Sequence, residues 1–246
     1  MTELAYDLHI HSCLSPCGDN DMTPHNIAAM AHIKGLKILA LTDHNTCRNA
    51  PALIEVAKEF DLIVLPGMEL TTQEEVHVLC LFAEEEAAAD FDAYVYERLQ
   101  KVPNRTEFFG EQILMNAQDE RVGEEEYLLS NATAISFDSV KETVESFEGI
   151  MIPAHLEKES TSLISNLGFI PPDARFTCAE INHPEKLPAL KEAHPYLEQC
   201  RIVTNSDAHT LGAISEPLHT LSFGTDMPSR KEILDLLAKE RTGTDP

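Results

Sequence analysis

The sequence predicts an α/β protein in which parallel strands form a barrel-like sheet. Short apolar runs alternate with amphipathic segments along the chain, and several of these runs are followed directly by a histidine. At 246 residues, with 43% hydrophobic and 24% charged residues, the chain can bury one large core, and nothing in its composition indicates disorder or repeats. We therefore expect a single domain over residues 1–246.

The N-terminal part has the βαβαβ pattern. Its apolar runs predict strands and its amphipathic segments predict the helices between them. The expected strands are 5–10, 38–41 and 63–65, and the expected helices are 24–34 and 51–60.

The first of these helices has clear boundary signals. Thr23 is a suitable N-cap, and Pro24 occupies the first helical position, where its missing N–H has no cost. Gly35 stands where a helix ending at Lys34 needs a residue in the left-handed conformation.

The rest of the chain continues the pattern around one long polar segment. Residues 84–147 favour helices and form either a helical insertion that caps the site or the longest crossover of the barrel. Further strands are expected at 76–82, 149–153, 178–181 and 201–204, with a closing helix at 229–241.

The charge and the chain ends limit the possible functions. With 42 acidic and 18 basic residues the formal charge is −24, which disfavours binding to long nucleic acids because that binding depends on Lys and Arg. The N-terminus lacks the pattern of a signal peptide, and no run reaches about 20 apolar residues. We expect a cytoplasmic protein without membrane contact, whose six cysteines, none in a CxxC pair, are free thiols.

Histidines mark the ends of four predicted strands. His9, His44, His155 and His209 each lie at or just beyond the C-terminal end of a strand. In a βα barrel these ends meet on one face, so the four imidazoles should lie close together. A lone buried histidine is more often a hydrogen-bonded core residue than a ligand, but the joint pattern favours a metal site.

Other potential ligands accompany these histidines. His9 and His11 lie on the same side of an extended strand, and Asp207 and His209 repeat this spacing. Glu69 follows the strand at 63–65, where its two oxygens could bridge neighbouring cations. His77 fits less well, because it begins its apolar run. The remaining histidines are expected at the surface or in packing contacts: His25, His32, His183, His194 and His219.

The ordered set DLHIHS, TDHN, GMEL, VHVL, PAH and SDAH resembles the signature of the PHP (polymerase and histidinol phosphatase) superfamily over residues 7–209. The resemblance implies a distorted (β/α)7 barrel with a trinuclear metal centre. It assigns His9, His11, Glu69 and Asp207 to one ion, Glu69, His77 and His155 to the second, and Asp19, His44 and His209 to the third.

One position departs from the family pattern. Members of the family have an acid or a histidine about five residues after the second histidine, in a Ser-Asp-Gly turn. This chain reads SPCGDND at residues 15–21. An expansion of three residues fits best and selects Asp19, with Asp21 and Cys17 as alternatives.

A mixed nitrogen and oxygen ligand set accepts two or three divalent ions of zinc, manganese or iron. Such ions can activate a bridging water for in-line attack on a phosphate. Asp7 and Asp43 flank ligand histidines and are expected to accept their second ring N–H. Arg48 and Lys158 are expected to bind the substrate phosphate from loops at the ligand face.

The leading functional hypothesis is a phosphoesterase that hydrolyses a small phosphomonoester, a nucleotide or a phosphorylated metabolite, with a metal-bridging hydroxide as nucleophile. The alternatives are a metal-binding or regulatory module without turnover, a 3′ exonuclease-like activity and an amidohydrolase. No GxSxG, P-loop or GxGxxG motif supports other chemistry. The sequence indicates neither the specific substrate nor the oligomeric state.

Overall fold

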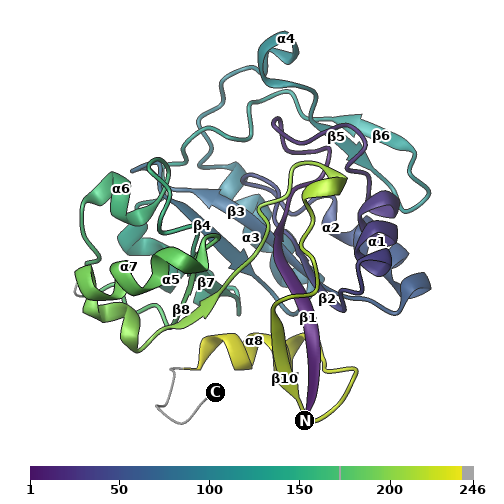
Figure 1. Ribbon diagram of the computed structural model, residues 1–246. Coiled ribbons are helices and arrows are strands. Elements are labelled where there is room, and N and C mark those ends of the chain that lie inside the picture. The colour runs from purple at the N-terminus through teal and green to yellow at the C-terminus, as the bar shows by residue number, and fades with distance from the viewer. Residues whose placement is uncertain (172, 240–246) are drawn as a thin grey trace.

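The computed structural model describes residues 1–171 and 173–239, and its centre is a curled, mixed sheet (Figure 1). Six strands are hydrogen-bonded in the order β10-β1-β2-β3-β4-β7. They are β1 (Thr2–Ile10), β2 (Ile38–Leu41), β3 (Ile63–Thr71), β4 (His77–Leu81), β7 (Ile150–Pro153) and β10 (Thr220–Phe223).

The sheet is not wholly parallel, which corrects the prediction. β1, β2 and β3 run parallel, but β4 is antiparallel to both β3 and β7, and β10 is antiparallel to β1. A tight turn joins β3 to β4, with Thr72 N–H donating to the Val76 carbonyl at 2.9 Å. So short a connection can join only antiparallel neighbours.

A separate parallel pair continues the curl. β8 (Cys178–Glu180) pairs with β9 (Arg201–Val203), and Leu156 N–H, just after β7, donates to the Glu180 carbonyl at 3.0 Å. Beyond β9, Ala208 forms a parallel bridge with Ile10 at the end of β1. The result is a half-barrel with an additional pair of strands, and the sevenfold (β/α) repeat stays a prediction.

Helices cover the sheet and close its lower end. The described residues form eight α-helices: α1 (Pro24–Ile33), α2 (Ala50–Ala57), α3 (Glu85–Tyr96), α4 (Thr106–Phe109), α5 (Phe137–Ser146), α6 (Leu163–Leu167), α7 (Leu187–Ala193) and α8 (Arg230–Ala238). The predicted boundaries of α1 are confirmed, because the Thr23 hydroxyl accepts from Asn26 N–H and Gly35 has a φ of 76°. The predicted end of α8 at 241 lies outside the described residues.

The segment 84–147 contains more than the predicted helices. Between α3 and α5 lie α4 and a hairpin of β5 (Ile113–Met115) and β6 (Arg121–Glu124). Leu99 and Leu129 in this segment pack with Leu14 on the loop after β1. The segment therefore contacts the upper end of the sheet, and its role as a cap stays a prediction.

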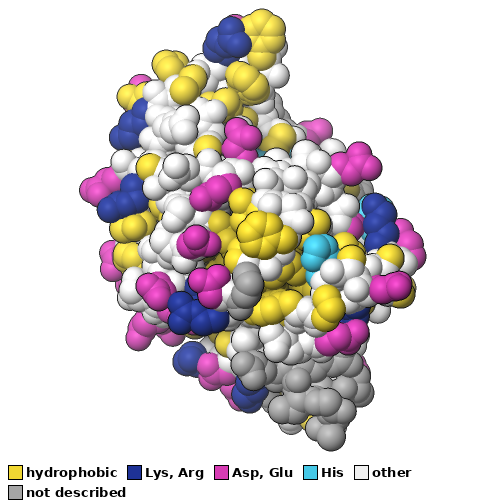
Figure 2. All heavy atoms as spheres, turned by 90° about the vertical axis from the view of Figure 1, so that its left-hand side faces the viewer, with side chains coloured by type: hydrophobic (Ala, Val, Ile, Leu, Met, Phe, Trp, Pro, Cys, Tyr) yellow, Lys and Arg dark blue, Asp and Glu magenta, His cyan; other side chains and the backbone are white. Residues whose placement is uncertain are grey.

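One of the apolar clusters fills the lower part of the half-barrel. Leu4, Tyr6 and Leu8 of β1 pack with the buried Ile233 and Leu237 of α8, which lies below the sheet in Figure 1. Polar groups are therefore concentrated at the opposite end. Acidic side chains are spread over the face that carries α6 and α7 (Figure 2). Within the described residues no helix has the length and apolar character needed to cross a membrane.

Candidate metal centre

The upper edge of the sheet brings eight histidine and carboxylate residues together, including His77 of β4. The end of β1 supplies His9 and His11, the loop after β2 supplies His44, and the loop after β7 supplies His155. The loop after β9 supplies Asp207 and His209. Glu69 lies within β3, because that strand continues through Pro66 and Gly67 to Thr71 instead of ending at residue 65 as predicted.

The direction of β4 explains the position of His77. His77 is the first residue of β4, and β4 runs opposite to β3 and β7. The start of an antiparallel strand lies at the same edge as the ends of its neighbours. His77 therefore reaches the same site as the histidines that follow parallel strands.

Glu69 is the centre of this cluster. Its side chain is 1% exposed, and each carboxylate oxygen faces different imidazoles. Oε1 lies 2.8 Å from His77 Nδ1, 3.0 Å from His155 Nε2 and 3.4 Å from His9 Nε2. Oε2 lies 3.1 Å from His44 Nδ1 and 3.4 Å from His11 Nε2. One carboxylate thus serves two groups of nitrogen donors.

Asp207 completes the side of the cluster formed by β1. Its Oδ1 lies 3.3 Å from both His9 Nε2 and His11 Nε2. Asp207 and His155 have positive φ angles of 54° and 31°, a backbone conformation that costs free energy and is often found at functional sites. The predicted set of His9, His11, Glu69 and Asp207 is thus brought together.

The polar contacts of the imidazoles fit a bound cation. His9 Nδ1 faces Glu180 and His11 Nδ1 faces the Ser15 hydroxyl, so the neutral rings carry their protons on Nδ1. Their Nε2 atoms are only 3.1 Å apart, so in the neutral rings two lone pairs would face one another. His44 Nδ1 and His155 Nδ1 are buried without a hydrogen-bond partner. A cation would satisfy all four nitrogens.

The charges in the cluster also favour a bound cation. Burial lowers the pKa of His11 and of His44, but the carboxylates outweigh it and raise both pKa values to about 9. Glu69 makes the main contribution at His44, and Asp207 and Glu69 make it at His11. Burial raises the pKa of Glu69, yet the surrounding imidazoles hold it well below its usual range. The site therefore keeps its carboxylates ionised and favours positive charge.

Glu180 fixes the orientation of the His9 ring, and its role was not predicted from the sequence. It is fully buried, and both of its oxygens lie 3.0 Å from His9 Nδ1. It also accepts from His155 N–H at 2.8 Å and from the Asn205 side chain at 2.7 Å. A buried glutamate in the predicted strand 178–181 is the signal that could have identified it.

The two predicted orienting aspartates act differently. Asp7 accepts from Ser206, from Ser215 and from the backbone N–H of His9, so these groups and not an imidazole ring occupy its oxygens. Asp43 accepts from the Ser15 hydroxyl at 2.7 Å, and Ser15 in turn faces His11 Nδ1 at 2.9 Å. Asp43 therefore orients His11 through a serine.

The predicted third ligand group is only partly assembled. The donor atoms of His11, His44 and His209 lie within 4.8 Å of one another. Asp19 is exposed, and its Oδ1 accepts from the backbone N–H of Asp21, which is exposed too. The Cys17 side chain, in contrast, lies beside that of His44 and contributes to the raised pKa of that ring.

The two predicted phosphate-binding residues have different surroundings. Lys158 Nζ contacts Asp207 at the edge of the cluster, and its side chain is 41% exposed. Arg48 donates to the buried Glu125 at 2.6 Å and lies over the ring of Tyr96. Lys158 therefore lies at the site, whereas Arg48 forms an ion pair with Glu125.

Two known proteins share sequence with parts of this chain. An uncharacterized protein from Methanocaldococcus jannaschii is 38% identical over 76 residues, which are 28% of this chain and 44% of that protein. A 5′-3′ exoribonuclease from Haemophilus influenzae is 33% identical over 79 residues, which are 31% of this chain and 28% of the enzyme. The matches therefore span less than half the length of each relative.

Solved structures show the same fold at low sequence identity. A protein assigned as a metal-dependent phosphoesterase, from Bifidobacterium adolescentis, has a TM-score of 0.62 and 17% identity, covering 96% of this chain and 97% of its own. The lesion-specific endonuclease from Pyrococcus furiosus has a TM-score of 0.60 and 18% identity, covering 85% of this chain but 49% of its own.

A protein-family model is consistent with the ligand motifs. The model described as the PHP domain matches residues 7–163, which include the ligand candidates from His9 to His155. The chain belongs to the PHP domain family of metal-dependent hydrolases.

Proposed function

We propose that the protein is a metal-dependent phosphoesterase that hydrolyses a small phosphomonoester, such as a nucleotide or a phosphorylated metabolite. The observation that carries the proposal is the position of Glu69, whose two oxygens face separate groups of imidazoles. A carboxylate in this position suits two or three neighbouring divalent ions of zinc, manganese or iron. Ions bound there would supply Lewis acidity and a water of lowered pKa.

The protein residues have distinct roles in this proposal. Glu69 and Asp207 would hold the ions together with the histidines, and Glu180 keeps the Nε2 atom of His9 directed at the site. Lys158, at the exposed edge of the cluster, attracts the phosphate and orients it. No side chain is needed as a nucleophile.

The charge of the protein supports a small substrate. A net charge of −24 repels long polyanions, whereas ions in the centre reverse the field locally for a single phosphate group. The similarity to a 5′-3′ exoribonuclease favours a second candidate, the release of nucleotides from the end of a short RNA.

The test is hydrolysis by protein loaded separately with zinc, manganese or iron. We expect turnover of p-nitrophenyl phosphate and of some members of a panel of nucleotides and phosphorylated metabolites, and loss of turnover in His9→Ala. His25→Ala is the matched control, because this exposed histidine lies on α1 beside Phe60. Turnover of short 5′-phosphorylated RNA alone would favour the second candidate. Metal binding without turnover of any ester would contradict both and favour a regulatory module.

A further inference from the structure

We propose that the thiolate of Cys17, and not a carboxylate, completes the third ligand group with His44 and His209. The inference rests on the proposed metal centre and specifies one of its ligands. It assigns a sulfur ligand where the family pattern has an acid or a histidine, and it makes this part of the site selective for ions that bind sulfur, zinc above all.

The loop that carries Cys17 is attached to both histidines. On one side of Cys17, the Ser15 hydroxyl accepts from His44 N–H at 3.2 Å. On the other side, Asp19 N–H donates to the His209 carbonyl at 2.9 Å. Between these anchors, Gly18 N–H donates to the Ser15 carbonyl at 2.9 Å. The backbone therefore holds Cys17 between the attachments to His44 and His209.

The Cys17 side chain is directed at this group. Its thiol is exposed and lies beside the His44 side chain, where it contributes to the raised pKa of that ring. His44 is itself 6% exposed, and its buried Nδ1 atom lies 3.1 Å from Glu69 Oε2 without forming a hydrogen bond. An unsatisfied buried nitrogen costs free energy, and an ion among the donors removes that cost. A thiol that binds a metal ion loses its proton to the solvent, so the bond formed is from the ion to the thiolate.

The two competing aspartates make contacts within their own turn and with α1. Asp19 is exposed and accepts from the N–H of Asp21 at 2.9 Å within its own turn. The Asp21 carbonyl accepts from the Asn26 side chain at 2.9 Å, which holds that residue toward α1. Among the described residues, the groups of donor atoms that lie within 4.8 Å of one another include none of Asp19, Asp21 and Cys17. Cys17 is the candidate of the three that reaches a histidine of the cluster.

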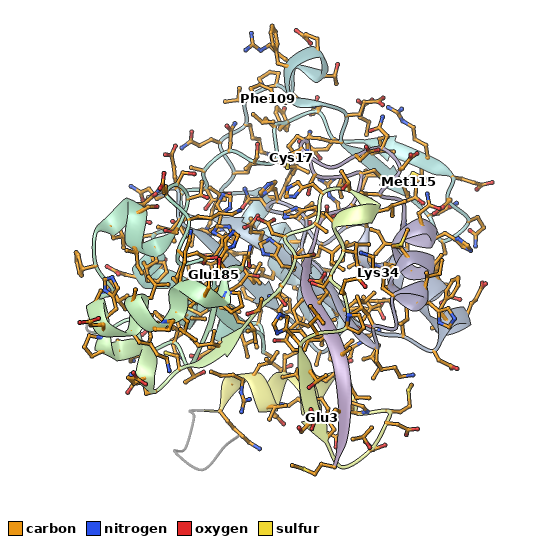
Figure 3. All side chains as sticks on the ribbon, in the orientation of Figure 1. Glu3, Cys17, Lys34, Phe109, Met115 and Glu185 are labelled. Carbon is orange, nitrogen blue, oxygen red and sulfur yellow. The ribbon has the colours of Figure 1, made fainter. Side chains whose placement is uncertain are left out.

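The tip of the segment 84–147 encloses the loop from above. Figure 3 shows Cys17 between the sheet and Phe109, which ends α4. Gly110 follows with a φ of 88°, and a Cβ there would lie 2.4 Å from the Pro16 carbonyl oxygen. This close contact restricts movement of the loop and so favours a preformed ligand position.

Cobalt substitution provides a direct test, because a thiolate bound to Co²⁺ gives a sulfur-to-metal charge-transfer band in the near ultraviolet. The structure describes all six cysteines, and the five others are buried, so such a band can be assigned to Cys17. We expect the band in the wild-type protein and in Asp19→Asn, and its absence in Cys17→Ser and Cys17→Asp. Cys17→Asp should retain the third ion, because it restores an acid.

Metal counting and thiol reactivity give independent readouts. Cys17→Ser should weaken binding of one ion by more than the roughly 10- to 100-fold that removal of an outer partner causes. In ion-free wild-type protein one thiol should react rapidly with Ellman's reagent, and zinc should protect it.

Two outcomes would overturn the assignment. Full cobalt binding without the band, or a band that persists in Cys17→Ser, would exclude the thiolate while leaving the proposed function intact. Failure of the wild-type protein to bind any divalent ion would instead reject the metal centre itself.

Discussion

Replacement of Glu180 by glutamine tests whether metal binding by the cluster depends on a residue outside the proposed ligand set. Glu180 accepts from His9 Nδ1 with both oxygens, from His155 N–H with Oε2 and from the Asn205 side chain with Oε1. Asn205 cannot rotate its amide freely, because its Oδ1 accepts from Leu8 N–H at 2.9 Å. Wherever the new amide nitrogen lies, it therefore faces another donor.

The expected magnitudes follow from these contacts. Loss of an outer partner of a ligand histidine lowers metal affinity by about 10- to 100-fold. This corresponds to about 1.4–2.8 kcal/mol at about 1.4 kcal/mol per tenfold change. The unmatched buried donor also lowers the free energy of unfolding of the ion-free protein by about 1–3 kcal/mol.

Competition with a chromophoric chelator measures the affinity, and thermal unfolding without metal measures the stability. Glu157→Gln is the matched control, since Glu157 lies in the loop after β7 and its Oε1 accepts only from Asn182 and His183 N–H, which an amide oxygen can replace. Unchanged metal affinity in Glu180→Gln, or an equal loss in the control, would refute the orienting role.

Three further predictions concern the charges of the site. Lys158→Ala should lower kcat/KM for p-nitrophenyl phosphate by about tenfold or more, because the Lys158 ammonium beside Asp207 attracts the phosphate. The metal content should not change. An unchanged kcat/KM would contradict this role. Metal at 100 times its Kd should stabilise the fold by about 2.7 kcal/mol and raise Tm by about 5–11 °C in a calorimetric scan, an increase that EDTA reverses. Because the pKa values of His11 and His44 are raised to about 9, both rings are protonated at pH 7.5 without metal, so binding should release protons and affinity should rise with pH up to about 9. Calorimetry in two buffers of different ionisation enthalpy measures this release, and identical binding enthalpies would show that no proton leaves.

Much of the site could be predicted because its candidate ligands lie at the ends of predicted strands. His9, His44 and Asp207 come after apolar runs that are easily recognised, and the curl of the sheet brings such positions together. The direction of β4 could not be recognised from its apolar run, since an antiparallel strand has the same composition as a parallel one. His77 therefore seemed misplaced in the sequence, although it lies in the cluster.

The orienting contacts were harder to predict because they depend on three-dimensional packing. Glu180 is 171 residues from His9 in the chain, and only the closure of the curled sheet places its carboxylate behind that ring. Arg48 was predicted to lie at the site because it is close to His44 in the sequence, but in the structure it forms an ion pair elsewhere. The buried acid that binds it, Glu125, belongs to the segment 84–147, whose path the sequence pattern did not reveal.

Burying the ion-free cluster at the upper end of the half-barrel costs free energy. Glu69, Glu180 and Asp207 are 1%, 0% and 10% exposed, and buried carboxylates are tolerated only when positive charge lies beside them. Apolar side chains of similar volume would pack there at lower cost. In the ion-free protein, protons on the imidazoles supply the missing charge, which is why the pKa values of His11 and His44 rise. The field that retains these protons also attracts divalent cations, so the arrangement fits a cation site better than it fits an apolar packing core.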